Sequence, residues 1–135
     1  MRIVLGLDVG TTSLSCVGYD CDRREIVAQT TLENLAARYG ALPEGLQAAE
    51  LDLHCLRGQL VDALGGVARK LPGAANVVAL GVTGQQHGVA LLNRSLEPIG
   101  NAITWQDQRT LLTMPGGAST WLQAFVEQAG GLNAF

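Results

Sequence analysis

One aspartate near the start of the chain lies among glycines and hydroxyl side chains. Residues 6–13 read GLDVGTTS and place Asp8 at the end of the apolar run IVLGL, two residues before Gly10. A carboxylate there can bind Mg²⁺ through water, because this ion prefers oxygen ligands and keeps much of its hydration. Gly10 lets backbone N–H groups approach an anion closely. Three hydroxyl side chains add donors: Thr11, Thr12 and Ser13. The stretch predicts either a magnesium–phosphate site or an ordinary tight turn.

The two common nucleotide-binding loops have other patterns. A Walker loop needs GxxxxGK[ST], and the single lysine of this chain is Lys70, far from the turn. A dinucleotide loop needs GxGxxG at the start of a helix, whereas a strand is expected after this turn. The strand that ends at Asp8 is otherwise apolar, and an acidic residue is unexpected there unless it has a function. This favours the site over the plain turn.

A second group of polar residues follows two other apolar runs. Residues 81–88 read GVTGQQHG and residues 102–109 read AITWQDQR. Because strand ends of α/β proteins bind ligands, we expect these side chains to gather there. The candidates are Gln86, His87, Trp105, Asp107 and Arg109. Amide, imidazole and carboxylate groups pair with sugar hydroxyls, and an indole face covers a ring or carbon chain.

Each of these residues also has a simpler interpretation. Taken alone, His87 is better explained by a loop histidine with its hydrogen bonds satisfied, and Trp105 by filling of the core. Asp107 and Arg109 fit a surface ion pair of little energetic value. Their joint appearance after the GLDVGTTS stretch favours a substrate site.

Hydrophobic patterning predicts a mixed sheet with flanking helices. Residues 2–10, 13–20 and 25–33 are expected to form an antiparallel meander, and 36–46 a loop rich in glycine and proline. The three-and-four spacing of apolar residues predicts a helix over 53–71, ended by Pro72 and Gly73, although Gly65 and Gly66 weaken it.

The later residues predict shorter elements. Residues 76–84 (NVVALGVTG) have the composition of a strand buried on both faces. Residues 88–93 and 101–105 predict two short strands, and 119–130 a second helix. Four of its residues are expected to face inward: Trp121, Leu122, Phe125 and Ala129.

Composition limits the class of protein. The chain has 135 residues, 47% hydrophobic and 16% charged, which predicts one globular domain. The net charge of −3 and the scattered arginines argue against nucleic-acid and anionic-membrane partners. Three cysteines without a CxxC pair indicate reduced thiols. We expect a cytoplasmic protein, because Asp8 interrupts any signal-peptide core and no apolar run approaches the roughly 20 residues of a membrane helix.

The stretch LGLDVGTTSLSCVGYD resembles the first phosphate motif of the actin-like ATPase superfamily, whose sheets are ribonuclease H-like. That superfamily includes sugar kinases, heat-shock chaperones and actin relatives. The pair GVTGQQHG and AITWQDQR resembles the FGGY family of carbohydrate kinases, whose usual patterns are close to SGQMHG and W-x-D-x-R. Thr83 and Gln86 depart from the first pattern. The resemblance spans residues 3–110.

The resemblance implies ATP-dependent phosphorylation of a sugar hydroxyl in a cleft between two domains, with Mg²⁺. By position, Asp8 would hold the magnesium–phosphate group near the attacked hydroxyl. Phosphate oxygens would be bound by Gly10, Thr11, Thr12 and Ser13. The sugar would be faced by Gln86, His87, Trp105 and Asp107, with Arg109 supporting the loop. QQHG and WQD are most similar to the ketose branch, of sedoheptulokinase or xylulokinase type.

The family's general base and adenine pocket lie in later segments, so residues 1–135 are expected to be an N-terminal part of the first domain. The C-terminal ATP-binding domain would be absent, and this chain alone would be inactive and poorly soluble. Two alternatives stay open: a chaperone- or filament-type ATPase, and a non-catalytic sugar-binding remnant.

Overall fold

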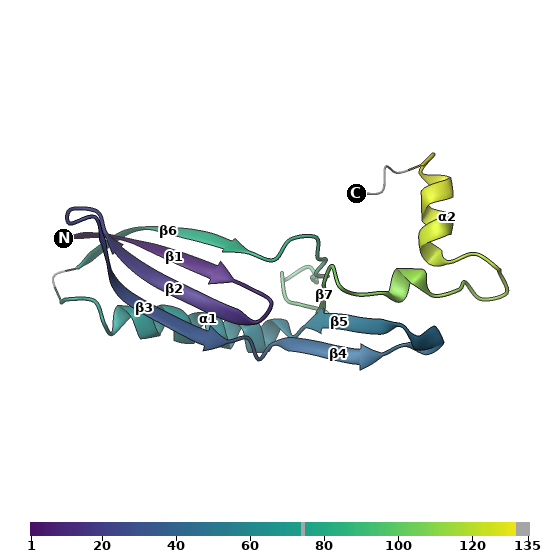
Figure 1. Ribbon diagram of the computed structural model, residues 1–135, viewed down its shortest axis with the longest axis horizontal. Helices are drawn as coiled ribbons and strands as arrows, with labels where there is room; N and C mark the ends of the chain where they lie inside the picture. The colour runs from purple at the N-terminus through teal and green to yellow at the C-terminus, as the bar shows by residue number, and fades with distance from the viewer. Residues whose placement is uncertain (74, 132–135) are drawn as a thin grey trace.

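The computed structural model describes residues 1–73 and 75–131. Its main body is a four-stranded sheet with one long helix, α1, against it (Figure 1). A smaller three-stranded sheet extends the body at one end, and a short helix, α2, lies beyond it. The predicted α/β class, a mixed sheet with flanking helices, is confirmed by this architecture.

The main sheet has the strand order β3-β2-β1-β6. Its members are β1 (Arg2–Val9), β2 (Ser13–Asp20), β3 (Glu25–Glu33) and β6 (Asn76–Gly84). The first three strands are antiparallel, as predicted, and β6 lies parallel to β1. In this register Asp8 lies beside Ser15 on β2 and Thr83 on β6. The aspartate is therefore flanked by a hydroxyl on each side.

Helix α1 (Leu53–Ala68) covers one face of the sheet. Its first turn is capped by Asp52, whose carboxylate accepts a hydrogen bond from the Cys55 N–H at 3.0 Å. The buried core between helix and sheet consists of Leu7, Cys16, Ala28, Ala63 and Val67. Cys16, Cys21 and Cys55 are all free thiols, as predicted, and burial raises the pKa of Cys16.

The predicted loop over residues 36–46 is wrong. Strands β4 (Ala37–Ala41) and β5 (Gln47–Leu51) form a hairpin there, joined by a 3₁₀ turn over Pro43–Gly45. Pro43 and Gly45 (φ 73°) occupy the turn itself, where glycine tolerates a positive φ, while Gly40 fits a strand opposite Ala48. Glycine and proline here therefore mark one tight turn and not a long loop. Strand β5 also pairs with β7 (Ala102–Ile103).

Strand β6 differs from the prediction of a strand buried on both faces. Every residue of β6 is exposed, because β6 is the edge strand and α1 packs against β2 and β3 on the other side of the sheet. The predicted strand over 88–93 is reduced to single bridges, Val89 with Ile103 and Leu92 with Pro98. The predicted strand over 101–105 is shortened to β7.

Helix α2 (Trp121–Gln128) forms within the predicted range. Thr120 caps it, and Gln123 completes a reciprocal capping box. The predicted inward face is wrong for the part of the chain that the structure describes: Trp121, Leu122 and Phe125 are 49%, 41% and 59% exposed, and Ala129 is exposed at the C-cap. Across residues 1–73 and 75–131, neither helix has the length and apolar composition of a membrane span.

Candidate functional site

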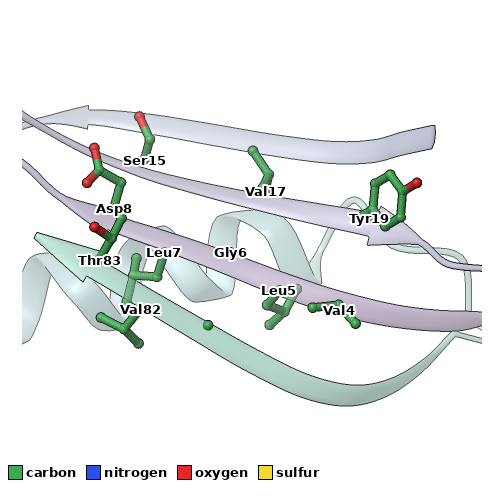
Figure 2. A pocket seen from close by; sticks show the side chains of 11 residues that line it. Val4, Leu5, Gly6, Leu7, Asp8, Ser15, Val17, Tyr19, Val82 and Thr83 are labelled. Atoms are coloured by element: carbon green, nitrogen blue, oxygen red, sulfur yellow. The ribbon is translucent and has the colours of Figure 1, made fainter. Parts of the chain in front are cut away.

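The GLDVGTTS stretch folds as the end of β1, a tight turn and the start of β2. Asp8 projects from the face of the sheet opposite α1, with Ser15 and Thr83 on either side (Figure 2). These three side chains edge an open hollow of about 620 Å³. The rest of its lining is mostly apolar, including Val4, Val17 and Tyr19 on the same sheet face. The only carboxylate of this hollow therefore lies at its polar end.

The turn is held by Asn34, which follows β3 and which the motif analysis missed. Its side-chain Nδ2 donates to the Gly10 carbonyl at 2.8 Å, and its backbone N–H donates to the Thr12 carbonyl at 2.9 Å. Inside the turn, the Gly10 N–H donates to the Ser13 carbonyl at 2.9 Å. A Cβ at Gly10 would lie 2.9 Å from that carbonyl oxygen, so the position requires glycine.

The backbone N–H groups of Thr11 and Thr12 make no hydrogen bond with another residue in the described part of the chain. They are free donors beside the Asp8 carboxylate. An anion placed at the turn would find two backbone donors and three hydroxyls, which is the donor set of a backbone anion nest. The geometry fits the predicted phosphate site, and the roles of its residues stay a prediction.

The QQHG segment leaves the end of β6 and crosses toward β7. The Gln85 N–H donates to the Val9 carbonyl at 3.1 Å, so the segment begins attached to the end of β1. His87 has a positive φ of 57°, a conformation uncommon for a residue with a Cβ. Val89 then pairs with Ile103 through two hydrogen bonds of 2.9 Å. Between these anchors, Gln86 and His87 are exposed and line a hollow of about 270 Å³.

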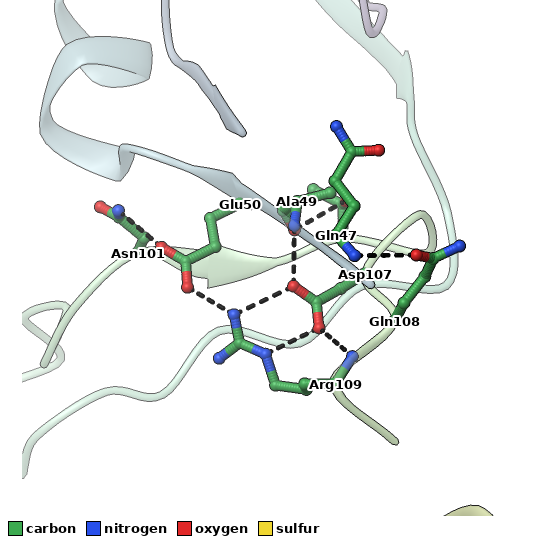
Figure 3. A network of polar contacts seen from close by, with 8 residues as sticks. Gln47, Ala49, Glu50, Asn101, Asp107, Gln108 and Arg109 are labelled. Carbon is green, nitrogen blue, oxygen red and sulfur yellow. Dashed lines mark hydrogen bonds and ion pairs between the residues drawn. The ribbon is translucent and has the colours of Figure 1, made fainter. Parts of the chain in front are cut away.

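Trp105 and Asp107 have opposite environments. Trp105 is 58% exposed, so core filling does not explain it here. The Asp107 side chain is 2% exposed, and its Oδ2 accepts from the Ala49 N–H of β5 at 2.8 Å (Figure 3). Arg109 donates three further hydrogen bonds to Asp107, from Nε, Nη2 and its backbone N–H. Each oxygen of this carboxylate thus accepts two hydrogen bonds from the protein.

Glu50 of β5 completes this network, and sequence patterns gave no sign of it. Its Oε1 lies 2.6 Å from Arg109 Nη2, and its Oε2 accepts from Asn101 at 2.9 Å. The hydrogen bond from Arg109 holds the pKa of Glu50 below its usual value. Burial pushes the pKa of Asp107 upward, but the hydrogen bonds from Arg109 and the Ala49 N–H outweigh it and the pKa is lowered.

The two polar groups of the sequence adjoin through a small cavity. Thr11 of the turn, Gln85 of the QQHG segment and Gln106 of the WQDQR loop line the same gap of about 10 Å³. Asp8 and His87 line separate hollows. Gln85 was absent from the candidate residues although it neighbours Gln86 in the motif. Gln85 is half-buried and its backbone is attached to Val9, which only the fold reveals.

The donor set around Asp8 suits Mg²⁺ held mainly by phosphate and water. In residues 1–73 and 75–131 no three His, Cys, Asp or Glu side chains cluster as ligands of a metal ion. Mg²⁺ commonly takes one or two carboxylates and completes its shell with water and substrate phosphates. A single exposed carboxylate beside free N–H donors fits that pattern.

Comparisons with known proteins agree with this arrangement. The "FGGY family of carbohydrate kinases, N-terminal domain" matches residues 3–129. Erythritol kinase of Brucella abortus is 32% identical over 114 residues, which are 83% of this chain and 21% of that protein. Glycerol kinase of Leptothrix cholodnii is 30% identical over 134 residues, 98% of this chain and 26% of that protein. The chain thus spans about a fifth to a quarter of the length of these relatives.

Solved structures show the same fold. Ligand-bound xylulose kinase from Lactobacillus acidophilus superposes with a TM-score of 0.68 at 22% identity, covering 96% of this chain and 22% of that one. Plasmodium falciparum glycerol kinase with ADP gives a TM-score of 0.68 at 23% identity, covering 98% of this chain and 24% of that one. With the family match over nearly all of its length, this chain belongs to the FGGY family of carbohydrate kinases, in its N-terminal domain.

Proposed function

We propose that these residues form part of an enzyme that transfers the terminal phosphoryl group of ATP to a hydroxyl of a small polyhydroxylated substrate. The observation that carries the proposal is the meeting of two donor groups where the main sheet ends and the smaller sheet begins (Figure 1). The turn after Asp8 supplies free N–H donors, and the QQHG and WQDQR segments adjoin it through the cavity shared by Thr11, Gln85 and Gln106.

The phosphate side would act by positioning and charge stabilisation. Thr11 and Thr12 would donate backbone and hydroxyl hydrogen bonds to phosphate oxygens, with Gly10 allowing close approach and Ser13 adding a hydroxyl. Asp8 would orient Mg²⁺ through its water shell. When bound, the ion would neutralise charge on the transferred group, which is much of what phosphoryl transfer requires.

The substrate side would divide into contact and support. Gln86, His87 and Trp105 are exposed and supply amide, imidazole and indole surfaces for a hydroxylated chain. An ionised carboxylate has about four acceptor sites, and Asp107 uses both oxygens twice within the protein. We therefore assign Asp107, with Arg109, to holding the loop that presents Trp105.

The remaining machinery would come from other segments. The chain spans about a fifth to a quarter of its relatives, and we propose that residues 1–135 work as the N-terminal part of a first domain. The general base and the adenine pocket would belong to later segments and to a C-terminal ATP-binding domain. We expect the 135-residue chain alone to be inactive and the complete enzyme to work in the cytoplasm.

Two substrate classes are candidates. The QQHG segment and the WQD triplet favour a ketose of the sedoheptulose or xylulose type, and a solved relative is a xylulose kinase. The curated relatives are named for erythritol and glycerol, which favours a linear polyol. Both classes present adjacent hydroxyls to the same amide and imidazole groups.

The test is ADP release by the full-length protein carrying these residues, with MgATP and a panel of xylulose, sedoheptulose, erythritol and glycerol. We expect release that depends on one of these compounds, and none from residues 1–135 alone. ATP hydrolysis indifferent to the panel would support a chaperone- or filament-type ATPase and contradict the proposal. Binding of a panel compound without ADP release would indicate the sugar-binding remnant.

A further inference from the structure

We infer that Asn34 is a positioning residue for nucleotide phosphate, an inference that rests on the proposed function. It lies just past the end of β3, 24 residues from the turn that it contacts. It belongs to none of the motifs, and it is 8% exposed. Its side-chain oxygen, its side-chain nitrogen and its backbone N–H all make hydrogen bonds within the fold, so its role is to hold other groups in place.

Two carbonyl groups of the turn are fixed by this one residue. The Gly10 carbonyl accepts from Asn34 Nδ2 at 2.8 Å, and the Thr12 carbonyl accepts from the Asn34 N–H at 2.9 Å. A trans peptide group is planar, so its N–H points opposite to its C=O. Fixing the Gly10 carbonyl therefore fixes the direction of the Thr11 N–H, and fixing the Thr12 carbonyl fixes that of the Ser13 N–H.

Asn34 is itself held in the orientation that this role needs. Its Oδ1 accepts from the Ala36 N–H at 2.9 Å, which leaves Nδ2 to face Gly10. The segment around it is tied to α1 by Gln59, which accepts from the Leu35 N–H at 3.0 Å and donates to the Glu33 carbonyl at 2.6 Å. The turn is thus anchored through Asn34 to β3 and the helix.

The consequence is preorganisation of the phosphate donors. Without the Asn34 amide, the peptide between Gly10 and Thr11 is free to rotate, and the Thr11 N–H must be reoriented when phosphate binds. The cost of that reorientation appears in nucleotide affinity. The cost should not appear in substrate affinity, because Asn34 makes no hydrogen bond to the QQHG or WQDQR residues in the described part of the chain.

Two variants of the full-length enzyme test this inference. Asn34→Asp keeps an acceptor for the Ala36 N–H but places an oxygen against the Gly10 carbonyl, and Asn34→Ala removes both side-chain bonds. We expect the KM for MgATP to rise about tenfold or more in both variants. A rise of this size corresponds to the loss of one hydrogen bond to a charged ligand. The KM for the hydroxylated substrate should stay within about twofold.

Gln59→Ala is the matched control, because it removes two hydrogen bonds from the same segment without touching the turn. We expect the KM for MgATP to stay within about twofold of wild type in this variant. A merely structural role for Asn34 predicts that Gln59→Ala and Asn34→Ala behave alike. Equal KM changes in the two variants, or an unchanged KM for MgATP in both Asn34 variants, would overturn the inference.

Amide hydrogen exchange separates this inference from the proposed function. Without nucleotide, the Gly10 N–H should exchange about tenfold faster in Asn34→Ala than in wild type or Gln59→Ala, because the turn opens. An unchanged exchange rate overturns the positioning role whatever the enzyme phosphorylates. Faster exchange in a protein that shows no ADP release with the panel would support the anchoring of the turn and contradict the kinase proposal.

Discussion

Glu50 Oε1 lies 2.6 Å from Arg109 Nη2, so the second strand of a hairpin holds the loop that follows β7. The same guanidinium donates to Asp107, and Asp107 accepts from the backbone of β5. The Arg109 guanidinium therefore lies between the carboxylates of Glu50 and Asp107 and donates to both. This network, more than the apolar core, fixes the WQDQR loop, because the hydrophobic cluster lies beneath the main sheet.

Replacing Glu50 by Gln tests the strength of this attachment. Glu50→Gln keeps the shape of the side chain but removes one charge from a pair whose side chains are 28% and 35% exposed. We expect the free energy of unfolding to fall by about 1 kcal/mol, between the values for exposed ion pairs and for hydrogen bonds to charged groups. Urea unfolding of the full chain followed by circular dichroism measures it.

The ion pair of Arg2 with Asp22 provides the control. Its side chains are 66% and 44% exposed, so solvent screens the pair. Asp22→Asn should change the stability by less than Glu50→Gln does. A larger loss in Asp22→Asn would show that the Glu50 network does not hold the chain together as described.

Acid should weaken the same network. The pKa values of Glu50 and Asp107 are lowered in the folded chain, so the folded state favours their ionised forms. The stability they contribute is complete above the ordinary carboxyl pKa of about 4 and is lost as the pH falls through the lowered values. We expect the urea midpoint to fall as the pH drops below about 5 and to keep falling through the lowered pKa values, with a shallower fall in Glu50→Gln.

Measurement in about 0.5 M NaCl keeps exposed pairs such as Arg2 with Asp22 from dominating that curve, because salt screens them most. Identical pH dependence in wild type and Glu50→Gln would contradict the role given to Glu50.

The elements predicted best were those with local signals. The meander of β1 to β3 follows from branched apolar runs and a polar corner, and α1 follows from three-and-four spacing of apolar residues. The hairpin of β4 and β5 was mistaken for a loop because glycine and proline signal a turn without giving its length. The exposure of β6 and α2 depends on which elements cover them, and composition alone does not carry that information.

The site divides in the same way. Short motifs contain Asp8, Gly10 and the QQHG and WQDQR residues, so these residues could be predicted from their spacing in the sequence. Asn34 and Glu50 act across 24 and 59 residues of sequence, and only the fold brings them to their partners. Each is one polar residue without a repeating pattern, so neither had a signal that spacing analysis detects.

Two glycines of α1 should respond oppositely to alanine. A Cβ at Gly66 would lie 2.7 Å from Thr30 Oγ1 on β3, so Gly66→Ala forces helix and sheet apart. A Cβ at Gly58 would meet nothing within 4 Å, and alanine is the better helix former. We expect Gly66→Ala to destabilise the chain by about 1–3 kcal/mol and Gly58→Ala to stabilise it by about 0.5–1 kcal/mol. Thermal unfolding of both variants measures the difference, and a shift in the same direction would contradict the packing described.

The exposed apolar strand β6 should make the 135-residue chain self-associate when expressed alone. Val78, Leu80 and Val82 are 51%, 49% and 64% exposed on an edge strand, which is a template for pairing with another chain. Val82→Lys should reduce association and the binding of a hydrophobic dye, since charge on an edge strand blocks pairing. Val61→Lys on the exposed side of α1, where Val61 is 63% exposed, is the matched control and should change neither. A monomeric wild-type chain with no dye binding would contradict this prediction.

Asp8 gives the most direct test of the proposed chemistry in the full-length enzyme. Asp8→Asn keeps the size of the side chain and removes the charge, at an exposed position where the fold does not depend on it. We expect the turnover number to fall at least about 100-fold, the scale of losing one electrostatic contact to a transition state, with little change in melting temperature. Ser15→Ala, at the neighbouring position on β2, should cost far less, because its hydroxyl already pairs with Thr31 at 3.0 Å. Wild-type turnover in Asp8→Asn with unchanged Mg²⁺ dependence would show that residues 6–13 form an ordinary turn and not a magnesium–phosphate site.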